Sequence, residues 1–206
     1  MKILGIYNAP TLVTMLGLVS GTVACILGLE KESALAIVAL IWAGIFDLFD
    51  GLVARRSKLN DFEKEFGIQI DSIVDMVSFG IAPVLIAASF GLDWLGYIAV
   101  ILYACAAAQR LAYFNVHQSE ADGKLQFYNG LPVTFSALIL GVGLSPTLFL
   151  SSAVTSIYIS VLMAVLAIAY IAPVRIPKPK GFIYILMPAL ALVFTGVWLY
   201  IGLVRG

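Results

Sequence analysis

The sequence is poor in charged residues, histidine and cysteine. Its 206 residues include one histidine and two cysteines, and only 12% are charged, with twelve basic and twelve acidic residues and no net charge. Hydrophobic residues make up 62% of the chain, which predicts an integral membrane protein. Cys25 and Cys105 lie in apolar runs, where we expect them to pack as small hydrophobic side chains and not as a disulfide. His117 lies in a polar segment, and we assign it no role.

Long polar segments are also missing, so the chain is divided mainly into apolar runs of the length that crosses a bilayer. A helix needs roughly 20 apolar residues to span about 30 Å of hydrocarbon. We expect about seven such helices: Pro10 to Leu29, Ala34 to Ala54, Gly67 to Phe90, Trp94 to Val116, Leu131 to Leu148, Ser151 to Ile171, and Phe182 to Val204.

These runs are too long and too uniformly apolar for barrel strands, so the predicted fold class is all-α, a polytopic helical bundle. We expect residues 1–206 to form one transmembrane domain, with the first run retained as a helix and not cleaved as a signal peptide. Leu59, Phe62 and Phe66 have helical spacing, so the segment 56–66 is either a short interfacial helix or a disordered loop.

Basic residues predict the orientation. Ten of the twelve fall on one side of the seven-helix arrangement: Lys2, Arg55, Arg56, Lys58, Lys64, Arg110, Lys124, Arg175, Lys178 and Lys180. Only Lys31 and Arg205 fall on the other side. Because cytoplasmic loops are enriched in Lys and Arg, we expect a cytoplasmic N-terminus in the cell membrane.

Four aspartates interrupt the apolar runs near this cytoplasmic side. Asp47 and Asp50 are three residues apart, and Asp71 and Asp75 are four apart, so each pair lies on one face of its helix. A charge at membrane depth costs on the order of 3 kcal/mol, and four acids therefore need an internal partner or a wet cavity. A short loop between the two helices brings the pairs together.

Oxygen-only ligand sets suit hard cations such as Mg²⁺, Mn²⁺ or Ca²⁺ better than zinc. The alternatives are that the acids are solvated helix ends or pair with Arg55 and Arg56. Gly51, Ala54 and Gly67 lie beside the acids and favour close approach of a ligand, although small residues also serve helix packing.

Arg55 follows Asp50 by about one helical turn, where it can bind phosphate oxygens or act as a cytoplasmic anchor. Carboxylates, hard cations and an arginine indicate phosphoryl chemistry on a phosphate-bearing lipid.

The spacing of these residues resembles the signature DxxDGxxAR...GxxxDxxxD of the CDP-alcohol phosphatidyltransferases. The matching residues are Asp47, Asp50, Gly51, Ala54, Arg55, Gly67, Asp71 and Asp75. Eleven residues separate Arg55 from Gly67, where the family usually has about eight. The blocks FGIQIDSIVDMVSFGIAP, QRLAYFNV, YNGLPVTFSA and IPKPKG look like the phosphatidylserine synthase branch.

The resemblance implies transfer of a phosphatidyl group from CDP-diacylglycerol, or an archaeal CDP-ether lipid, to the hydroxyl of L-serine, with CMP as product. Two divalent cations, Mg²⁺ or Mn²⁺, would be held by Asp47, Asp50 and Asp71, with Asp75 at the edge. The nucleotide and its diphosphate would be bound by seven of these residues: Asp47, Asp50, Gly51, Ala54, Arg55, Gly67 and Asp71. Asp75 would be the general base, a role that competes with full metal coordination.

The acceptor site is predicted less directly. Arg110 is a candidate for the carboxylate of serine, and Ser78 and Asn115 for further hydrogen bonds, with Ser72 a weaker one. The family also implies a homodimer, and we expect no nucleic-acid partner. Two alternatives remain open: the same chemistry with glycerol 3-phosphate, inositol phosphate or an amino alcohol as acceptor, and, from another class, a cation transporter. A membrane scaffold ranks below both.

Overall fold

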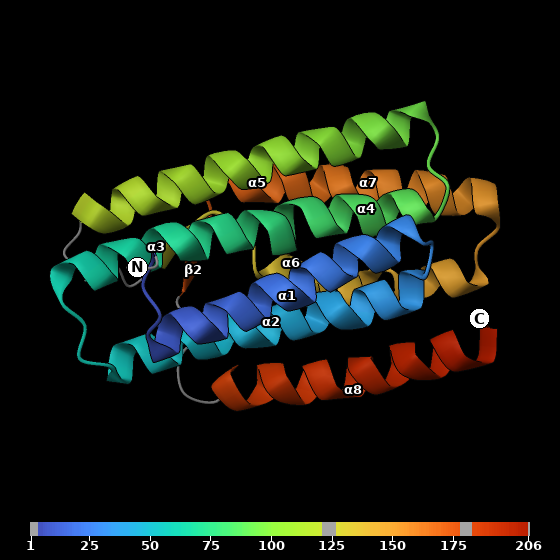
Figure 1. Cartoon of the computed structure of the whole chain (residues 1–206). Coiled ribbons are helices and arrows are strands. Elements are labelled where there is room, and N and C mark those ends of the chain that lie inside the picture. Colours follow the sequence, from blue (N-terminus) through green and yellow to red (C-terminus); the bar gives the residue numbers. More distant parts are fainter. Residues whose placement is uncertain (1–3, 121–126, 178–182, 206) are drawn as a thin grey trace.

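The computed structural model describes residues 4–120, 127–177 and 183–205, which form an elongated bundle of helices (Figure 1). The elements are, in chain order, α1 (Ala9–Leu29), α2 (Ser33–Arg56), α3 (Asp61–Asp75), the π-helix η1 (Met76–Ile81), α4 (Ala82–Ser89), α5 (Trp94–Glu120), β1 (Phe127–Asn129), α6 (Phe135–Gly143), the 3₁₀-helix η2 (Ser145–Phe149), α7 (Ser152–Ile171), β2 (Arg175–Pro177) and α8 (Ile183–Arg205). The predicted helical class is confirmed.

Six helices in this part of the chain are long and apolar enough to cross a membrane: Ala9–Leu29, Ser33–Arg56, Asp61–Ser89, Trp94–Val116, Ser152–Ile171 and Tyr184–Val204. The fifth expected helix is the exception. Its apolar helical part is Phe135–Phe149, which at about 1.5 Å per residue gives roughly 22 Å. Gly130 and Pro132 delay the start of the helix, so the run is shorter than the hydrocarbon core it was expected to span.

Small residues bring α1 against both α2 and the helix that follows α3. A Cβ atom at Gly17 would lie 3.5 Å from the Phe46 Cβ, and one at Gly21 would collide with the Ser78 side chain. Ser78 is buried and its hydroxyl donates to the Gly17 carbonyl at 3.5 Å. This close approach fixes α1 as one wall of the region that contains the aspartates.

The segment 61–89 is one continuous helix whose middle, η1, is π-helical and starts directly after Asp75. Short π-helical insertions occur often at functional sites, because the extra residue per turn changes the direction of the side chains that follow. Ser78, the third residue of η1, faces α1.

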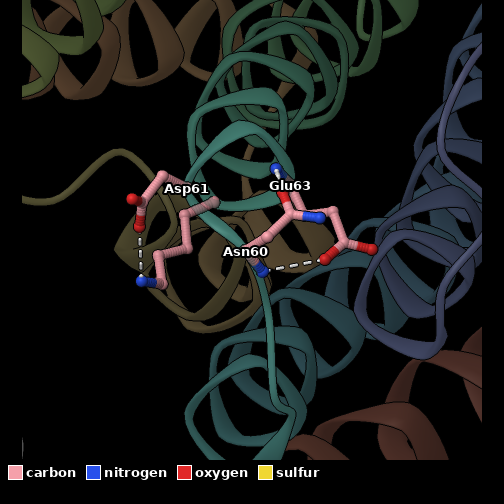
Figure 2. Close-up of polar contacts among 4 residues, drawn as sticks. Asn60, Asp61 and Glu63 are labelled. Carbon is pink, nitrogen blue, oxygen red and sulfur yellow. Dashed lines mark hydrogen bonds and ion pairs between the residues drawn. The ribbon is translucent and has the colours of Figure 1, made fainter.

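The start of α3 corrects the expectation for residues 56–66. Arg56 ends α2, and α3 begins at Asp61, so no separate interfacial helix forms. Asn60 caps α3: its side chain accepts from the Glu63 amide at 2.9 Å, while Glu63 accepts from the Asn60 amide at 2.9 Å. Figure 2 shows this reciprocal pair, which satisfies two amides that an uncapped helix would leave open.

The other side of the aspartate region is built by α5, against which α7 packs. The Tyr103 hydroxyl donates to the Phe79 carbonyl at 2.6 Å and lies 2.9 Å from the Tyr170 hydroxyl, so buried hydroxyls join η1, α5 and α7. The strands β1 and β2 pair antiparallel beyond α5 and α7 and are an addition to the predicted all-helical bundle. Gly130, at φ +79°, makes the turn from β1 toward α6.

The structure also describes the cap of the first helix and both cysteines. Asn8 caps α1, since its side chain accepts from the Thr11 amide at 3.1 Å. Cys25 and Cys105 are free thiols, as expected. Lys2, Lys124, Lys178 and Lys180, which contributed to the predicted orientation, lie outside the described residues.

Candidate active site

The four aspartates come from the C-terminal half of α2 and from the C-terminal half of α3. Asp47, Asp71 and Asp75 each place one carboxylate oxygen within 4.8 Å of the others. Asp75 is 6% exposed, and Asp50 is 8% exposed on the adjoining turn of α2. Both pairs therefore converge as the three- and four-residue spacings predicted.

Such a cluster is stable only if something offsets the repulsion between its charges. Two carboxylates 4.8 Å apart repel by about 3.5 kcal/mol at an effective dielectric constant of about 20. The donors that converge are carboxylate oxygens, which is the ligand type preferred by Mg²⁺, Mn²⁺ and Ca²⁺. The residues thus fit a hard divalent cation held by Asp47, Asp71 and Asp75, with Asp50 next to them.

Asp50 has a partner that the sequence did not reveal. The Thr14 hydroxyl, on α1, donates to Asp50 at 2.7 Å, and both side chains are buried. Thr14 is also within 3.2 Å of the Pro10 carbonyl. A lone threonine in an apolar run carries no sequence signal of such a bond, because its partner is 36 residues away. The bond holds one Asp50 oxygen in place.

A cavity of about 400 Å³ opens on the α1 side of the aspartates. It is lined by residues of α1, α2, α3 and the connection between α2 and α3: Asn8, Pro10, Thr11, Thr14, Asp50, Gly51, Ala54, Arg55, Ser57, Leu59, Glu63, Lys64, Gly67, Ile68, Ile70 and Asp71. Six of the eight signature positions line this cavity. We call it the α1-side cavity.

Glycine keeps the α1-side cavity open. A Cβ atom added at Gly67 would meet no atom within 4 Å, so the space beside it belongs to the cavity and not to a packed neighbour. A Cβ at Gly51 would meet only the Arg55 guanidinium, at 3.5 Å. The guanidinium therefore lies over the small-residue face, where it can reach an anion that the aspartates alone would repel.

A second cavity, of about 180 Å³, opens on the α5 side of the same aspartates. We call it the α5-side cavity. Its lining includes Asp47, Asp71, Asp75, Arg110 and Asn115. Asp71 lines both cavities, so the acid cluster lies between them.

The polar groups of the α5-side cavity are held in place by neighbouring side chains. Arg110 is 6% exposed, and its guanidinium lies 4.8 Å from the centre of the Phe114 ring. The Asn115 amide donates to the Ser72 hydroxyl at 2.7 Å. Arg110 and Asn115, two predicted acceptor residues, thus come together with Ser72 beside Asp75.

Ser78 lies apart from these acceptor candidates. Its hydroxyl points to α1 and the Gly17 carbonyl, and it lines a small space beneath the aspartates and not the α5-side cavity. Ser78 lies within η1, directly after the helix that carries Asp71 and Asp75.

Comparison of the sequence with known proteins identifies its family. Residues 7–172 match the family model for CDP-alcohol phosphatidyltransferase. A protein of Methanocaldococcus jannaschii named CDP-diacylglycerol–serine O-phosphatidyltransferase is 32% identical over 189 residues, covering 90% of this chain and 82% of its own length.

Two further relatives have related names. The Bacillus subtilis protein of the same name is 33% identical, with 64% of this chain and 72% of that protein covered. The archaetidylserine synthase of Methanothermobacter thermautotrophicus is 27% identical, with 87% and 74% covered. By its family match and its similarity along most of its length, the chain belongs to the CDP-alcohol phosphatidyltransferase family of enzymes.

Proposed function

We propose that the protein transfers the phosphatidyl group of CDP-diacylglycerol, or of an archaeal CDP-ether lipid, to the hydroxyl of L-serine and releases CMP. The observation that carries the proposal is the acid cluster between two cavities, one with Arg55 and the other with Arg110. Transfer between two substrates needs two binding sites that share one reacting centre. The relatives named for a serine acceptor support serine over other alcohols, and the archaetidylserine synthase supports the ether-lipid alternative.

Two divalent cations, Mg²⁺ or Mn²⁺, complete this proposal, since the family is generally dependent on divalent metals. Asp47, Asp50, Asp71 and Asp75 would hold them. When bound, the ions would neutralise the diphosphate of the donor and the charge that develops on the departing CMP.

The donor's nucleotide occupies the α1-side cavity in this account. Gly51, Ala54 and Gly67 leave room for the ribose and the base against the helices, and Arg55 binds phosphate oxygens. Thr14 keeps Asp50 oriented toward the cavity, so it is a positioning residue and not a ligand of the donor. The reacting phosphorus then lies over the acids, next to the α5-side cavity.

The acceptor occupies the α5-side cavity, with the carboxylate of serine on Arg110 and further hydrogen bonds from Asn115. Asp75 takes the proton of the serine hydroxyl as that oxygen attacks the lipid-linked phosphorus. The new oxygen–phosphorus bond forms while the bond from that phosphorus to the bridging oxygen of the diphosphate breaks, and CMP leaves with the bonding electrons. Asp75 lines the α5-side cavity and not the α1-side cavity, which suits a base for the acceptor.

The membrane orientation and assembly belong to the same proposal. Arg55, Arg56, Lys58, Lys64 and Arg110 gather at the end of the bundle that holds the acids, which supports a cytoplasmic active site. A homodimer follows from the family resemblance, and light scattering of the protein in detergent measures it.

The test is release of CMP by the purified protein in detergent with CDP-diacylglycerol and Mn²⁺ or Mg²⁺. The acceptors to compare are L-serine, glycerol 3-phosphate, inositol phosphate and none. Release that depends on serine supports the proposal. Release only with another acceptor would refute the serine assignment, and no release with any metal or acceptor would refute the function.

A further inference from the structure

The connection between α2 and α3 lines the donor cavity. Eleven residues lie between Arg55 and Gly67. The structure uses this segment for a connection at residues 57–60 and for the first turns of α3. Ser57, Leu59, Glu63 and Lys64 all line the α1-side cavity. The segment between Arg55 and Gly67 therefore supplies part of the wall of the proposed donor site.

The two ionisable side chains that this segment contributes to the cavity, Glu63 and Lys64, differ in how strongly their present partners hold them. Glu63 is part of the capping pair with Asn60 (Figure 2), which ties its carboxylate to the helix end. The Lys64 ammonium lies 2.9 Å from an oxygen of Asp61, with the side chains 59% and 100% exposed respectively. An exposed ion pair is worth about 0–1 kcal/mol, so Lys64 can exchange Asp61 for a stronger anion.

The charges around the α1-side cavity favour that exchange. The acidic residues of the lining are Asp50 and Asp71 at the aspartate cluster and Glu63 in the capping pair, while Arg55 and Lys64 are the basic ones. A nucleoside diphosphate brings two negatively charged phosphates to the cavity. Arg55, the cationic side chain next to the aspartates, can pair with only part of that charge. A second cation on the facing wall would offset it.

We infer that Lys64 is a donor-binding residue, which leaves Asp61 and pairs with the phosphate of the cytidine nucleotide when the donor enters the α1-side cavity. The inference rests on the proposed function. It assigns to the first turns of α3 a role in donor affinity, and it makes Asp61 a competitor for the same ammonium group.

The chain offers a matched control for this role. Lys58 belongs to the same connection and is exposed, but it does not line the cavity. Lys58→Ala and Lys64→Ala remove the same charge from the same segment, so general attraction of an anion to a basic surface falls equally in both. Only Lys64→Ala removes a cation from the cavity wall.

The experiment is calorimetric titration of CMP into the purified protein with Mn²⁺, at low salt and at 1 M NaCl. At low salt we expect Lys64→Ala to weaken CMP binding about two- to five-fold, the range of an exposed ion pair. Lys58→Ala should leave it within about 1.5-fold, and Lys64→Arg should restore most of the loss. The Lys64→Ala effect should shrink at 1 M NaCl, where the screening length is about 3 Å.

Asp61→Asn gives a second measurement with the opposite sign. Removal of the competing carboxylate should tighten CMP binding up to about two-fold at low salt, and the gain should disappear in the Asp61→Asn/Lys64→Ala double variant. In turnover assays Lys64→Ala should raise the KM for the CDP-lipid and leave the KM for serine unchanged.

Equal losses in Lys58→Ala and Lys64→Ala, or an unchanged affinity in Lys64→Ala, would overturn this inference and leave the proposed function intact. Absence of metal-dependent CMP binding by the unaltered protein would instead overturn the proposed function together with the inference.

Discussion

Replacing Asp75 by asparagine should stabilise the metal-free protein while it abolishes turnover. The substitution removes one charge from a cluster whose carboxylate oxygens lie within 4.8 Å of one another. Each repelling pair at that separation is worth about 3.5 kcal/mol at an effective dielectric constant of about 20. Asp75 takes part in two such pairs, with Asp47 and Asp71, and the cost of burying the new amide offsets part of the relief. A gain of about 1–3 kcal/mol in the metal-free state is therefore expected.

The assay is thermal unfolding in detergent, followed by the fluorescence of Trp42, Trp94 and Trp198, in EDTA and in excess Mn²⁺. In EDTA, Asp75→Asn should melt above the unaltered protein. Mn²⁺ at about 100 times its Kd stabilises a folded protein that binds it by about 2.7 kcal/mol. Because Asp75→Asn lacks one proposed metal ligand, the melting temperature of the unaltered protein should rise more in Mn²⁺ than that of the variant. Serine-dependent turnover of Asp75→Asn should fall by about 10²-fold or more, the usual contribution of a general base.

Asp61→Asn is the matched control for this experiment, since Asp61 is fully exposed and outside the cluster. Its melting temperature should change little in either buffer. The reasoning is refuted if the unaltered protein melts at the same temperature in EDTA and in Mn²⁺, or if Asp75→Asn destabilises the metal-free protein. Normal turnover by Asp75→Asn would remove Asp75 from the role of base.

Three further predictions follow from other contacts. Thr14→Val keeps the side-chain shape but removes the hydroxyl that donates to Asp50. A hydrogen bond to a charged group is worth about 1.5–3 kcal/mol, so metal-dependent CMP binding, measured by calorimetry, should weaken about tenfold or more. Gly67→Leu should abolish CMP binding without lowering the melting temperature, because the new side chain enters the α1-side cavity and no packed neighbour. Arg110→Lys should raise the KM for serine several-fold and leave CMP affinity unchanged, since lysine keeps the charge but not the paired geometry for a carboxylate; equal effects on both substrates would contradict separate sites.

The sequence predicted most of the membrane helices, because their boundaries follow from apolar length and from capping residues such as Asn8. It also predicted that the two aspartate pairs converge, since helical spacing and a short connection between neighbouring helices leave few other arrangements. The run from Leu131 was expected to span the membrane, but Gly130 and Pro132 shorten its helix. Composition alone does not reveal where a helix starts inside an apolar run.

Other features depend on contacts between residues far apart in the chain. The bond from Thr14 to Asp50 joins α1 to α2, and Ser78 lies in a π-helical turn that regular spacing does not predict. The separation of the site into two cavities required the positions of α1 and α5. The sequence predicted an interfacial helix or a loop for residues 56–66, whereas α3 begins at Asp61. The amphipathic spacing of this segment does not distinguish a separate helix from an extension of the next one.

The most direct measurement is mass-spectrometric detection of the lipid product after the purified protein is incubated with CDP-diacylglycerol and L-serine, with Mn²⁺ or with EDTA. We predict that phosphatidylserine forms with Mn²⁺, in an amount equal to the CMP released, and that none forms in EDTA. Phosphatidylserine formed equally well in EDTA would contradict the metal-dependent acid cluster as the reacting centre, and no phosphatidylserine in either condition would contradict the transfer to serine.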